Sequence, residues 1–274
     1  MNSLPSADSN RIATRMEKAG DSSDLLRERS IFVALPAFNE AVGLPSLLTK
    51  LNRALKPLDF EFKIILVDDA STDDTAKVSR AHMNQMPIHL VQHEQNKGLS
   101  GALDTGFKTA LRMAMDGDII VTMDADDTHM PATINCLLLK IEEGYDVVIA
   151  SRYQPGSRVE GVPFTRLLMT EAARYLFRMI MPIKGVRDYT CGFRAYRYSV
   201  LREGFDHYGK DFVSETGFSC MVDVLLKLRR FGFIMGEVPM LLRYDQKHGP
   251  SKMKVGMTAF KTLRLLIKRR LGGY

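Results

Sequence analysis

Two aspartates follow an apolar run near the middle of the 274-residue chain. Residues 119–123 predict a buried strand, and Asp124 and Asp126 come directly after it. Because alternate residues of a strand point to the same side, the two carboxylates can converge on one ligand. Their hard oxygens suit Mg²⁺ or Mn²⁺, ions that also bind phosphate oxygens. The pair indicates a metal-dependent site for a phosphorylated ligand, although an isolated Asp-x-Asp is more commonly an acidic loop or a helix cap.

A second set of polar side chains contains two arginines and a threonine. Arg152 follows a predicted strand at residues 146–150, and Arg166 and Thr170 lie four positions apart in a predicted helix. Residues with this spacing share one helix face. The planar fork of arginine binds phosphate oxygens in pairs. The two arginines are therefore suited to a phosphate, and the alternative is that they are solvated surface residues.

Short apolar segments alternate with helical patterns from residue 31 onward. The strands are expected at residues 31–35, 62–67, 88–91, 118–123, 146–150 and 232–238. The helices are expected at residues 40–55, from 71 onward, and at 99–115, 131–143, 165–181 and 215–230. This alternation predicts an α/β fold, with a mostly parallel central sheet and helices on both faces. Ligands of such sheets bind at the carboxyl ends of the strands, where residues 36–40, 68–71 and 124–126 all lie.

The composition is that of an ordinary globular protein, with 45% hydrophobic and 26% charged residues. Its three cysteines form no Cys-x-x-Cys pair, which argues against a zinc site or a disulfide framework and favours a reducing cytoplasm. No segment approaches the roughly 20 apolar residues of a membrane-spanning helix. Residues 1–29 are polar and lack the apolar core of a signal peptide, so we expect a flexible tail there.

The net charge of +6 is concentrated at the C-terminus. Residues 243–274 contain nine lysines or arginines and one acid, Asp245, which argues against a general nucleic-acid coat. Residues 256–274 predict a basic amphipathic helix. Its apolar stripe contains Phe260, Leu263, Ile267 and Leu271, and its basic residues are Lys261, Arg264, Lys268, Arg269 and Arg270. We expect this helix to lie on a membrane surface; the alternative is a helix packed on the domain at residues 30–255, with solvated lysines.

Seven short motifs, taken together, resemble the family-2 glycosyltransferases with the GT-A fold. They are Leu35-Pro36-Ala37-Phe38-Asn39-Glu40, Val67-Asp68-Asp69-Ala70-Ser71, Asn96-Lys97-Gly98, Asp124-Ala125-Asp126, Ser151-Arg152-Tyr153, Cys191-Gly192-Phe193-Arg194 and Ser251-Lys252. Their order and spacing are most similar to those of the dolichyl (polyprenyl) phosphate mannose synthase group. The resemblance covers residues 31–254 and leaves both ends of the chain outside it.

The resemblance implies a role for each matching residue. The residues implied in binding a nucleotide-diphospho-sugar are Pro36, Phe38, Glu40, Asp69, Gly98, Asp124, Ala125 and Asp126. Those implied in binding the acceptor phosphate are Arg152, Arg166, Thr170, Ser251 and Lys252. Catalysis is implied for Asp124, Asp126 and Arg152, and the two aspartates are implied as ligands of Mg²⁺ or Mn²⁺.

Two details of the motifs bear on the site. Asp69 is expected to accept a hydrogen bond from the base or ribose of the donor, whereas Asp68 is expected to cap the following helix. In the synthase group a glutamine two positions after the second aspartate can add a metal ligand. Thr128 occupies that position in this chain, followed by His129, which leaves the third protein ligand open.

We therefore expect an inverting glycosyltransferase that moves mannose or glucose from GDP-mannose or a UDP-sugar to a polyprenyl phosphate. A phosphate monoester has a second pKa of about 6, so this acceptor is anionic at neutral pH and requires no strong general base. Glu215 and Asp223 are expected first as a helix cap and a helix-face residue. One alternative is that Glu215 or Asp223 is a general base, in which case the acceptor would be a soluble or glycan hydroxyl. Another alternative is a non-catalytic protein that binds a membrane or a partner. The expected location is the cytoplasmic face of a membrane. The expected partners are the bilayer and, as an option, a membrane protein. No nucleic-acid partner is expected.

Overall fold

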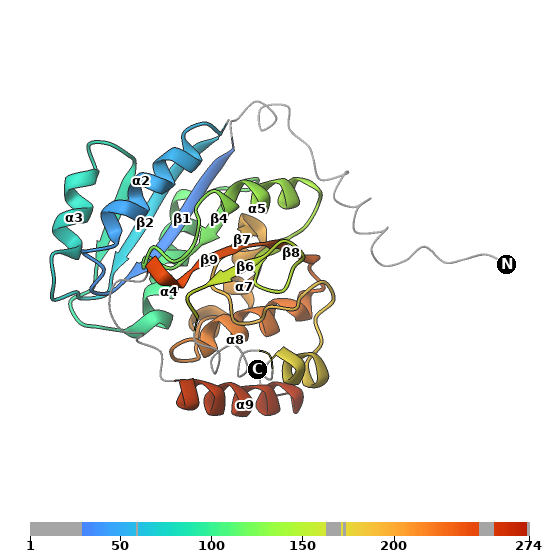
Figure 1. The fold of residues 1–274 in the computed structure, drawn as a ribbon. Coiled ribbons are helices and arrows are strands. Elements are labelled where there is room, and N and C mark those ends of the chain that lie inside the picture. The colour runs from blue at the N-terminus through green and yellow to red at the C-terminus, as the bar shows by residue number, and fades with distance from the viewer. Residues whose placement is uncertain (1–28, 59, 163–170, 172–173, 247–254, 273–274) are drawn as a thin grey trace.

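The computed structural model describes residues 29–58, 60–162, 171, 174–246 and 255–272. A seven-stranded sheet lies at the centre of the molecule, in the order β3-β2-β1-β4-β7-β5-β8 (Figure 1). Its strands are β1 (Ser30–Ala37), β2 (Glu61–Asp68), β3 (Ile88–Gln92), β4 (Ile119–Thr122), β5 (Val147–Ser151), β7 (Arg194–Arg197) and β8 (Met235–Pro239). All neighbouring strands pair in parallel except β7, which runs antiparallel to β4 and β5. The predicted α/β fold with a mostly parallel sheet is confirmed.

The inner strands are buried on both faces, which explains why they are nearly continuous apolar runs. In β1, Val33 pairs with Ile64 of β2 on one side and with Val121 of β4 on the other. All three side chains are fully shielded from solvent. Apolar residues on both faces of a strand are shielded from water only when helices cover both faces of the sheet.

Seven α-helices have assigned bounds within the described residues. They are α2 (Leu44–Leu55), α3 (Thr75–His82), α4 (Gly98–Met113), α5 (Thr133–Glu142), α7 (Tyr198–Tyr208), α8 (Ser219–Leu228) and α9 (Val255–Arg270). The chain moves outward from β1 to β3 through α2 and α3, then returns to β4 through α4. Since crossovers between parallel strands are right-handed, α4 covers the face opposite to α2 and α3. On the α4 side, α4 contacts α7, α7 contacts α8, and α8 contacts α9 (Figure 1).

Strand β7 was not predicted. It has only four residues, and it begins and ends with arginine. Arg194 is nevertheless fully buried, because it donates hydrogen bonds to the backbone carbonyls of Met221 (2.7 Å) and Tyr189 (2.8 Å). A second sheet of β6 (Arg158–Glu160) and β9 (Leu241–Arg243) was also absent from the sequence-based expectation.

Several predicted element boundaries were too early. Helix α2 begins at Leu44 instead of residue 40, and α3 begins at Thr75 instead of residue 71. The intervening residues form hydrogen bonds between the two loops: Glu40 N–H, for example, donates to Thr75 Oγ1 at 2.9 Å. Strand β8 begins at Met235 and α8 at Ser219, so Glu215 is not a residue of that helix.

Helix α9 packs on α8 through a face that the sequence did not single out. Leu265, Leu266 and Arg269 are buried there. Three residues of the predicted apolar stripe, Leu263, Ile267 and Leu271, are instead exposed, and the side chain of Phe260 lies outside the described residues. The packed alternative for this helix is therefore confirmed, with a different buried face. Across the residues that have a description, no helix has the length and apolar character to span a bilayer.

The predicted tail at residues 1–29 lies outside the described residues, apart from Arg29. The division into a tail, a domain at 30–255 and a helix at 256–274 stays a prediction.

Candidate active site at the carboxyl edge of the sheet

The predicted donor-binding residues lie at successive strand ends on one edge of the sheet. Pro36 is the penultimate residue of β1, and Phe38 and Glu40 follow that strand. Asp69 follows β2 directly, and Gly98 opens α4 after β3. Asp124, Ala125 and Asp126 come shortly after β4. The sheet therefore brings together segments that are separated by up to about one third of the chain, as the α/β pattern predicted.

The loops after β1 and β2 are cross-linked into one unit. Asn39 has a φ of +53°, a conformation that asparagine tolerates better than most residues. Its backbone N–H donates to Ser71 Oγ at 2.9 Å, and its Oδ1 accepts from Thr72 N–H at 2.8 Å. Ala41 N–H adds a hydrogen bond to Asp73 Oδ2 at 3.1 Å. These bonds fix the backbone of the turn that the family resemblance assigns to the nucleotide.

The two aspartates at the end of β2 have different environments. Asp68 Oδ1 accepts from Ser71 N–H at 3.1 Å, in the turn before α3. The expectation that Asp68 caps the following helix is wrong, because α3 begins at Thr75 and its N-cap residue is Asp74. Asp69 is buried, and its Oδ1 lies 2.8 Å from Lys97 N and 2.7 Å from His93 Nδ1. The other ring nitrogen of His93 lies 2.9 Å from Thr105 Oγ1. Sequence reasoning missed His93 and Thr105, which hold the Asp69 carboxylate in one orientation.

Asp124 and Asp126 lie in the loop beyond β4, which ends at Thr122. Strand alternation therefore does not align them, and the sequence argument is wrong on this point. Asp126 Oδ1 accepts from Thr128 N–H (3.2 Å) and from the Thr128 hydroxyl (2.7 Å), so Thr128 holds this carboxylate. Asp127, between Asp126 and Thr128, instead forms an ion pair with Lys50 at 2.8 Å. Its backbone has a φ of +59°.

The surroundings of Asp124 fit a divalent cation. Both Asp124 and Asp126 are partly exposed, so a ligand can reach their hard oxygens. Gly192 lies beside Asp124: a Cβ at this position would be 3.5 Å from Asp124 Oδ1 and 3.1 Å from Met221 Cε. The glycine therefore keeps space open at the carboxylate. Among the described residues, no group of three or more His, Cys, Asp or Glu side chains is placed to hold a metal ion.

Arg152 follows β5 and is held by an aspartate that the sequence analysis did not consider. Its Nε and Nη2 donate to Asp188 Oδ2 (2.8 Å) and Oδ1 (2.6 Å), and Nη2 also donates to Thr190 Oγ1 at 2.6 Å. Asp188 Oδ1 accepts a further bond from Cys191 N–H at 3.1 Å. Burial alone would raise the pKa of Asp188, but the charge and hydrogen bonds of Arg152 hold that pKa below its ordinary value. The signal that was available is the position of Asp188, three residues before the Cys191-Gly192-Phe193-Arg194 motif.

Strand β7 explains why these groups meet. It pairs with β4 (Thr122 opposite Arg194) and with β5 (Ile149 opposite Arg194). Since β7 is antiparallel, the residues that precede it emerge at the same edge as the ends of β4 and β5. The Thr122 hydroxyl donates to Gly192 O at 2.7 Å and fixes this arrangement. The segment at residues 188–192 thus lies between the aspartate pair and Arg152.

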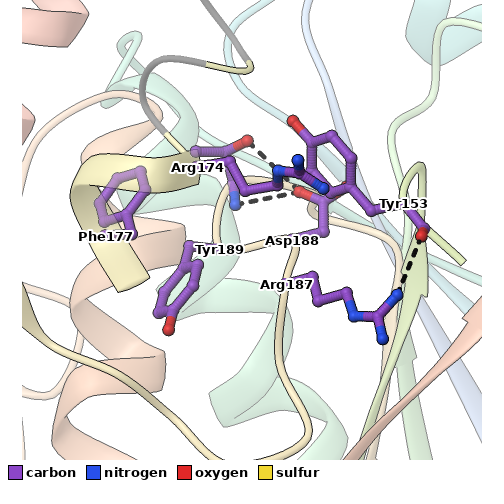
Figure 2. Close-up of a pocket in the computed structure, with 7 residues that line it drawn as sticks. Tyr153, Arg174, Phe177, Arg187, Asp188 and Tyr189 are labelled. Carbon is purple, nitrogen blue, oxygen red and sulfur yellow. Dashed lines mark hydrogen bonds between the residues drawn. The ribbon is translucent and has the colours of Figure 1, made fainter. Parts of the chain in front are cut away.

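A small cleft lies beside Asp188, the partner of Arg152 (Figure 2). The residues labelled along it are Tyr153, Arg174, Phe177, Arg187, Asp188 and Tyr189. Phe177 and Tyr189 stack with ring centres 4.9 Å apart and form its apolar wall. Arg174, which sequence reasoning missed, extends over the ring of Tyr153. Burial raises the pKa of the Tyr153 hydroxyl, so this group is neutral at physiological pH.

Four predicted acceptor-site residues lie outside the described residues. They are Arg166, Thr170, Ser251 and Lys252. Of the two alternative base candidates, Asp223 is fully buried and paired with Lys227 and Arg269. Glu215 lies in the segment before α8, 3.9 Å from Lys268 Nζ.

The fold defines the class of the protein. Solved structures with the same arrangement include glucosyl-3-phosphoglycerate synthase of Mycobacterium tuberculosis, in complex with Mn²⁺, UDP and phosphoglyceric acid. The two chains are 22% identical, with a TM-score of 0.62 over 89% of this chain and 79% of that one. The chain has the GT-A fold, as the sequence motifs predicted.

The family follows from the sequence comparison. The family described as glycosyl transferase family 2 matches residues 32–205, and the chain belongs to it. A dolichol-phosphate mannosyltransferase of Pyrococcus furiosus is 34% identical over 235 residues, which are 85% of this chain and 62% of that protein. A polyprenol monophosphomannose synthase of Mycolicibacterium smegmatis is 29% identical over 263 residues, which are 94% of this chain and 95% of that protein. The chain thus spans less than two thirds of the first relative and nearly all of the second.

Proposed function

We propose that this protein is an inverting glycosyltransferase that moves a hexose from a nucleotide-diphospho-sugar to a polyprenyl phosphate. One observation carries the proposal. Asp124, suited to a metal-bound diphosphate, and Arg152, suited to a phosphate monoester, stand at the ends of two strands that both pair with β7. Such a site has one subsite for each of the two anionic substrates. The names of the relatives from Pyrococcus and Mycolicibacterium support the same acceptor class.

The donor subsite of the proposal runs along the ends of β1, β2 and β4. The cross-linked loops at Asn39 and Ser71 present backbone to the nucleotide, and Asp69 accepts a hydrogen bond from its base or ribose. Asp124 and Asp126 hold Mg²⁺ or Mn²⁺, which neutralises the diphosphate leaving group when bound. Mannose from GDP-mannose is our first choice of donor, and a UDP-sugar is the second.

The proposed reaction needs little proton transfer. An oxygen of the acceptor phosphate forms a bond to the anomeric carbon of the sugar, while the bond from that carbon to the diphosphate oxygen breaks and its electron pair leaves with the nucleoside diphosphate. The phosphate is largely ionised at neutral pH, because its second pKa is about 6. Arg152, with Arg166, Thr170, Ser251 and Lys252, orients this nucleophile on the face opposite the leaving group.

The environment of Asp223 bears on the alternative of a hydroxyl acceptor. A general base must reach the proton that it removes. Asp223 is fully buried, and both of its oxygens are occupied, by Lys227 on one side and by Arg269 on the other. This supports a phosphate acceptor over a hydroxyl acceptor that would depend on Asp223.

Helix α9 supports a further part of the proposal, which is peripheral binding to an anionic bilayer. On its outer side, Leu263, Ile267 and Leu271 are exposed, by 38%, 50% and 81%. Exposed basic residues accompany them, namely Arg264, Lys268 and Arg270. Apolar and cationic side chains on one exposed surface are the combination by which interfacial helices bind anionic lipid. We place the enzyme on the cytoplasmic side of such a membrane, and a membrane-protein partner remains an option there.

Turnover with defined substrates tests the proposal. The purified chain is incubated with Mg²⁺ or Mn²⁺, a panel of nucleotide-sugars and geranyl phosphate, and the prenyl-phospho-sugar is measured by mass spectrometry. We expect product with geranyl phosphate and none with geraniol, which has the hydroxyl without the phosphate. Product with geraniol or with a soluble glycan alone would contradict the phosphate acceptor. A non-catalytic protein would bind vesicles, release no nucleoside diphosphate from any donor, and show no metal-dependent rise in melting temperature with the panel.

A further inference from the structure

Two arginines flank one tyrosine ring in the cleft. Figure 2 shows Arg174 over the ring of Tyr153, and the guanidinium carbon of Arg174 lies 4.6 Å from the ring centre. The guanidinium carbon of Arg152, which the figure does not draw, lies 5.8 Å from the same centre. Like charges repel strongly where water is scarce. A site that gathers two guanidinium groups is therefore suited to an anion between or beside them.

The two arginines differ in how their charge is balanced. Arg152 forms a two-pronged ion pair with Asp188, which is almost completely buried, so the pair is neutral as a unit. Arg174 pairs with Glu171, three residues earlier in the chain, at 2.8 Å. The side chain of Glu171 is 42% exposed, and such a pair in contact with solvent is weak. Of these two arginines, Arg174 is thus the one that an incoming anion can more readily take over.

The Nε–H group of Arg174 is buried and has no hydrogen-bond partner within the part of the chain that the structure describes. A buried donor without a partner costs free energy, and native proteins contain few of them. An anion bound against Arg174 would accept this hydrogen bond together with one from the neighbouring Nη group. Arginine binds phosphate oxygens in this paired manner.

The position of Arg174 in the sequence agrees with its position in the cleft. Arg166, Thr170 and Arg174 follow one another at intervals of four residues. Residues at this spacing lie along one face of a helix. Residue 174 lies in the described helical segment 174–180, whereas 166 and 170 fall outside the described residues. Arg174 continues the face that the sequence motifs assign to the acceptor phosphate.

We propose that Arg174 is a further acceptor-binding residue, which grips the phosphate of the prenyl phosphate through Nε and Nη and holds it over Tyr153, next to Arg152. This inference rests on the proposed function. Because Asp188 balances the charge of Arg152, Arg174 supplies positive charge that a phosphate dianion requires. Arg174 therefore helps the enzyme to select a phosphorylated acceptor over the corresponding alcohol.

Acceptor affinity in three variants tests this role. Arg174→Gln, Arg174→Ala and Arg174→Lys are prepared in the full chain, with geranyl phosphate as the acceptor probe. We expect Arg174→Gln and Arg174→Ala to raise the KM for geranyl phosphate about tenfold or more, with the donor KM unchanged. Arg174→Lys should lie between these variants and the wild type, because it keeps the charge but not the fork. Arg202→Ala, which removes an exposed arginine paired with Asp206 within α7, is the matched control and should leave both constants unchanged.

Calorimetric titration of geranyl phosphate in the absence of donor separates the outcomes. If all three variants bind it as the wild type does, and only their melting temperatures fall, Arg174 is a packing residue and the inference is wrong. An equal rise in the donor KM would assign Arg174 to the donor diphosphate and would also overturn it. If the wild-type chain binds and glycosylates no geranyl phosphate, the proposed function fails as well. If the wild type binds and glycosylates geranyl phosphate and the three variants do so equally well, only the role of Arg174 is rejected, and the proposed function stands.

Discussion

Arg269 of α9 and Asp223 of α8 form a buried ion pair, with Nε and Nη2 each 2.7 Å from Asp223 Oδ1. Lys227 approaches the other oxygen of Asp223 at 2.6 Å. The side chains of all three residues are nearly or fully shielded from solvent. The carboxylate thus fastens the C-terminal helix to the domain and pairs with two cations at once.

We expect Asp223→Asn to lower the free energy of unfolding by about 3 to 5 kcal/mol, because it leaves two buried cations without a counter-ion. Urea denaturation followed by circular dichroism measures this change. Arg270→Ala, the next residue on α9 and an exposed one, is the control and should have little effect. If Asp223→Asn kept full stability and lost only turnover, Asp223 would be a base and the hydroxyl alternative would be favoured.

Asp124→Asn and Asp126→Asn should each reduce turnover by about a hundredfold or more while the protein stays folded, because a departing diphosphate needs a metal to neutralise it. Initial rates at saturating Mg²⁺ and Mn²⁺, with melting temperatures alongside, check this. Asp116→Asn changes an exposed aspartate before β4 and serves as the control. A variant with a near-wild-type rate in the presence of a chelator would show that the metal assignment is wrong.

The Thr128 hydroxyl orients the carboxylate of Asp126. Loss of a group that orients a metal ligand typically weakens metal binding about tenfold or more. Thr128→Val should therefore raise the metal concentration for half-maximal activity about tenfold. Thr128→Ser keeps the hydroxyl and should behave as the wild type. The measurement is a titration of activity with Mn²⁺. Equal metal requirements in all three proteins would mean that the hydroxyl does not orient the ligand.

Asp188 should stabilise the fold in a pH-dependent way. Its folded pKa lies below the ordinary value of 3.8, so the unfolded chain binds the proton more readily than the folded one. The stabilisation is therefore fully present above about pH 4 and is lost as the pH falls through the lower, folded pKa. The difference in unfolding free energy between the wild type and Asp188→Asn, measured from pH 7 downward, should be constant at first and then shrink. Asp206→Asn, an exposed aspartate in a surface pair, should show no comparable loss.

The double substitution Ile267→Ser with Leu271→Ser should weaken binding to anionic vesicles without unfolding the protein, because both side chains are exposed. Each nearby basic residue contributes about 1 kcal/mol at such a surface, so residual binding should be sensitive to salt. Vesicle sedimentation measures the change, and Leu139→Ser, an exposed leucine on α5, is the control. Removal of all residues after Val255 is not an equivalent test, since it would uncover the α8 surface on which Leu265 and Leu266 pack. Unchanged sedimentation of the double variant would place the membrane contact elsewhere.

The sequence was sufficient for the sheet edge and for the position of the predicted donor-binding residues along it. Apolar runs such as residues 31–35 and 119–123 are long enough to indicate strands that are buried on both faces. A parallel sheet then places the polar residues after each run at one edge, which is why Asp69 and Asp124 were predicted to share it. These inferences depend only on local patterns and on the geometry common to all such sheets.

Tertiary structure alone decided what surrounds Arg152 and which face of α9 is buried. Arg194 of strand β7 is buried because it donates hydrogen bonds to the carbonyls of Tyr189, five residues before it, and of Met221, 27 residues after it. No local periodicity in the sequence indicates these partners. The same strand delivers Asp188 to Arg152 across 36 residues. In α9, apolar residues occur on two sides of the helix. The side that contains Arg269 is buried, because Arg269 pairs there with Asp223, which is 46 residues earlier in the chain. The position of a buried charge can be predicted only when its partner is known, because an unpaired buried charge is costly. The fold, and not the neighbouring sequence, determines that partner.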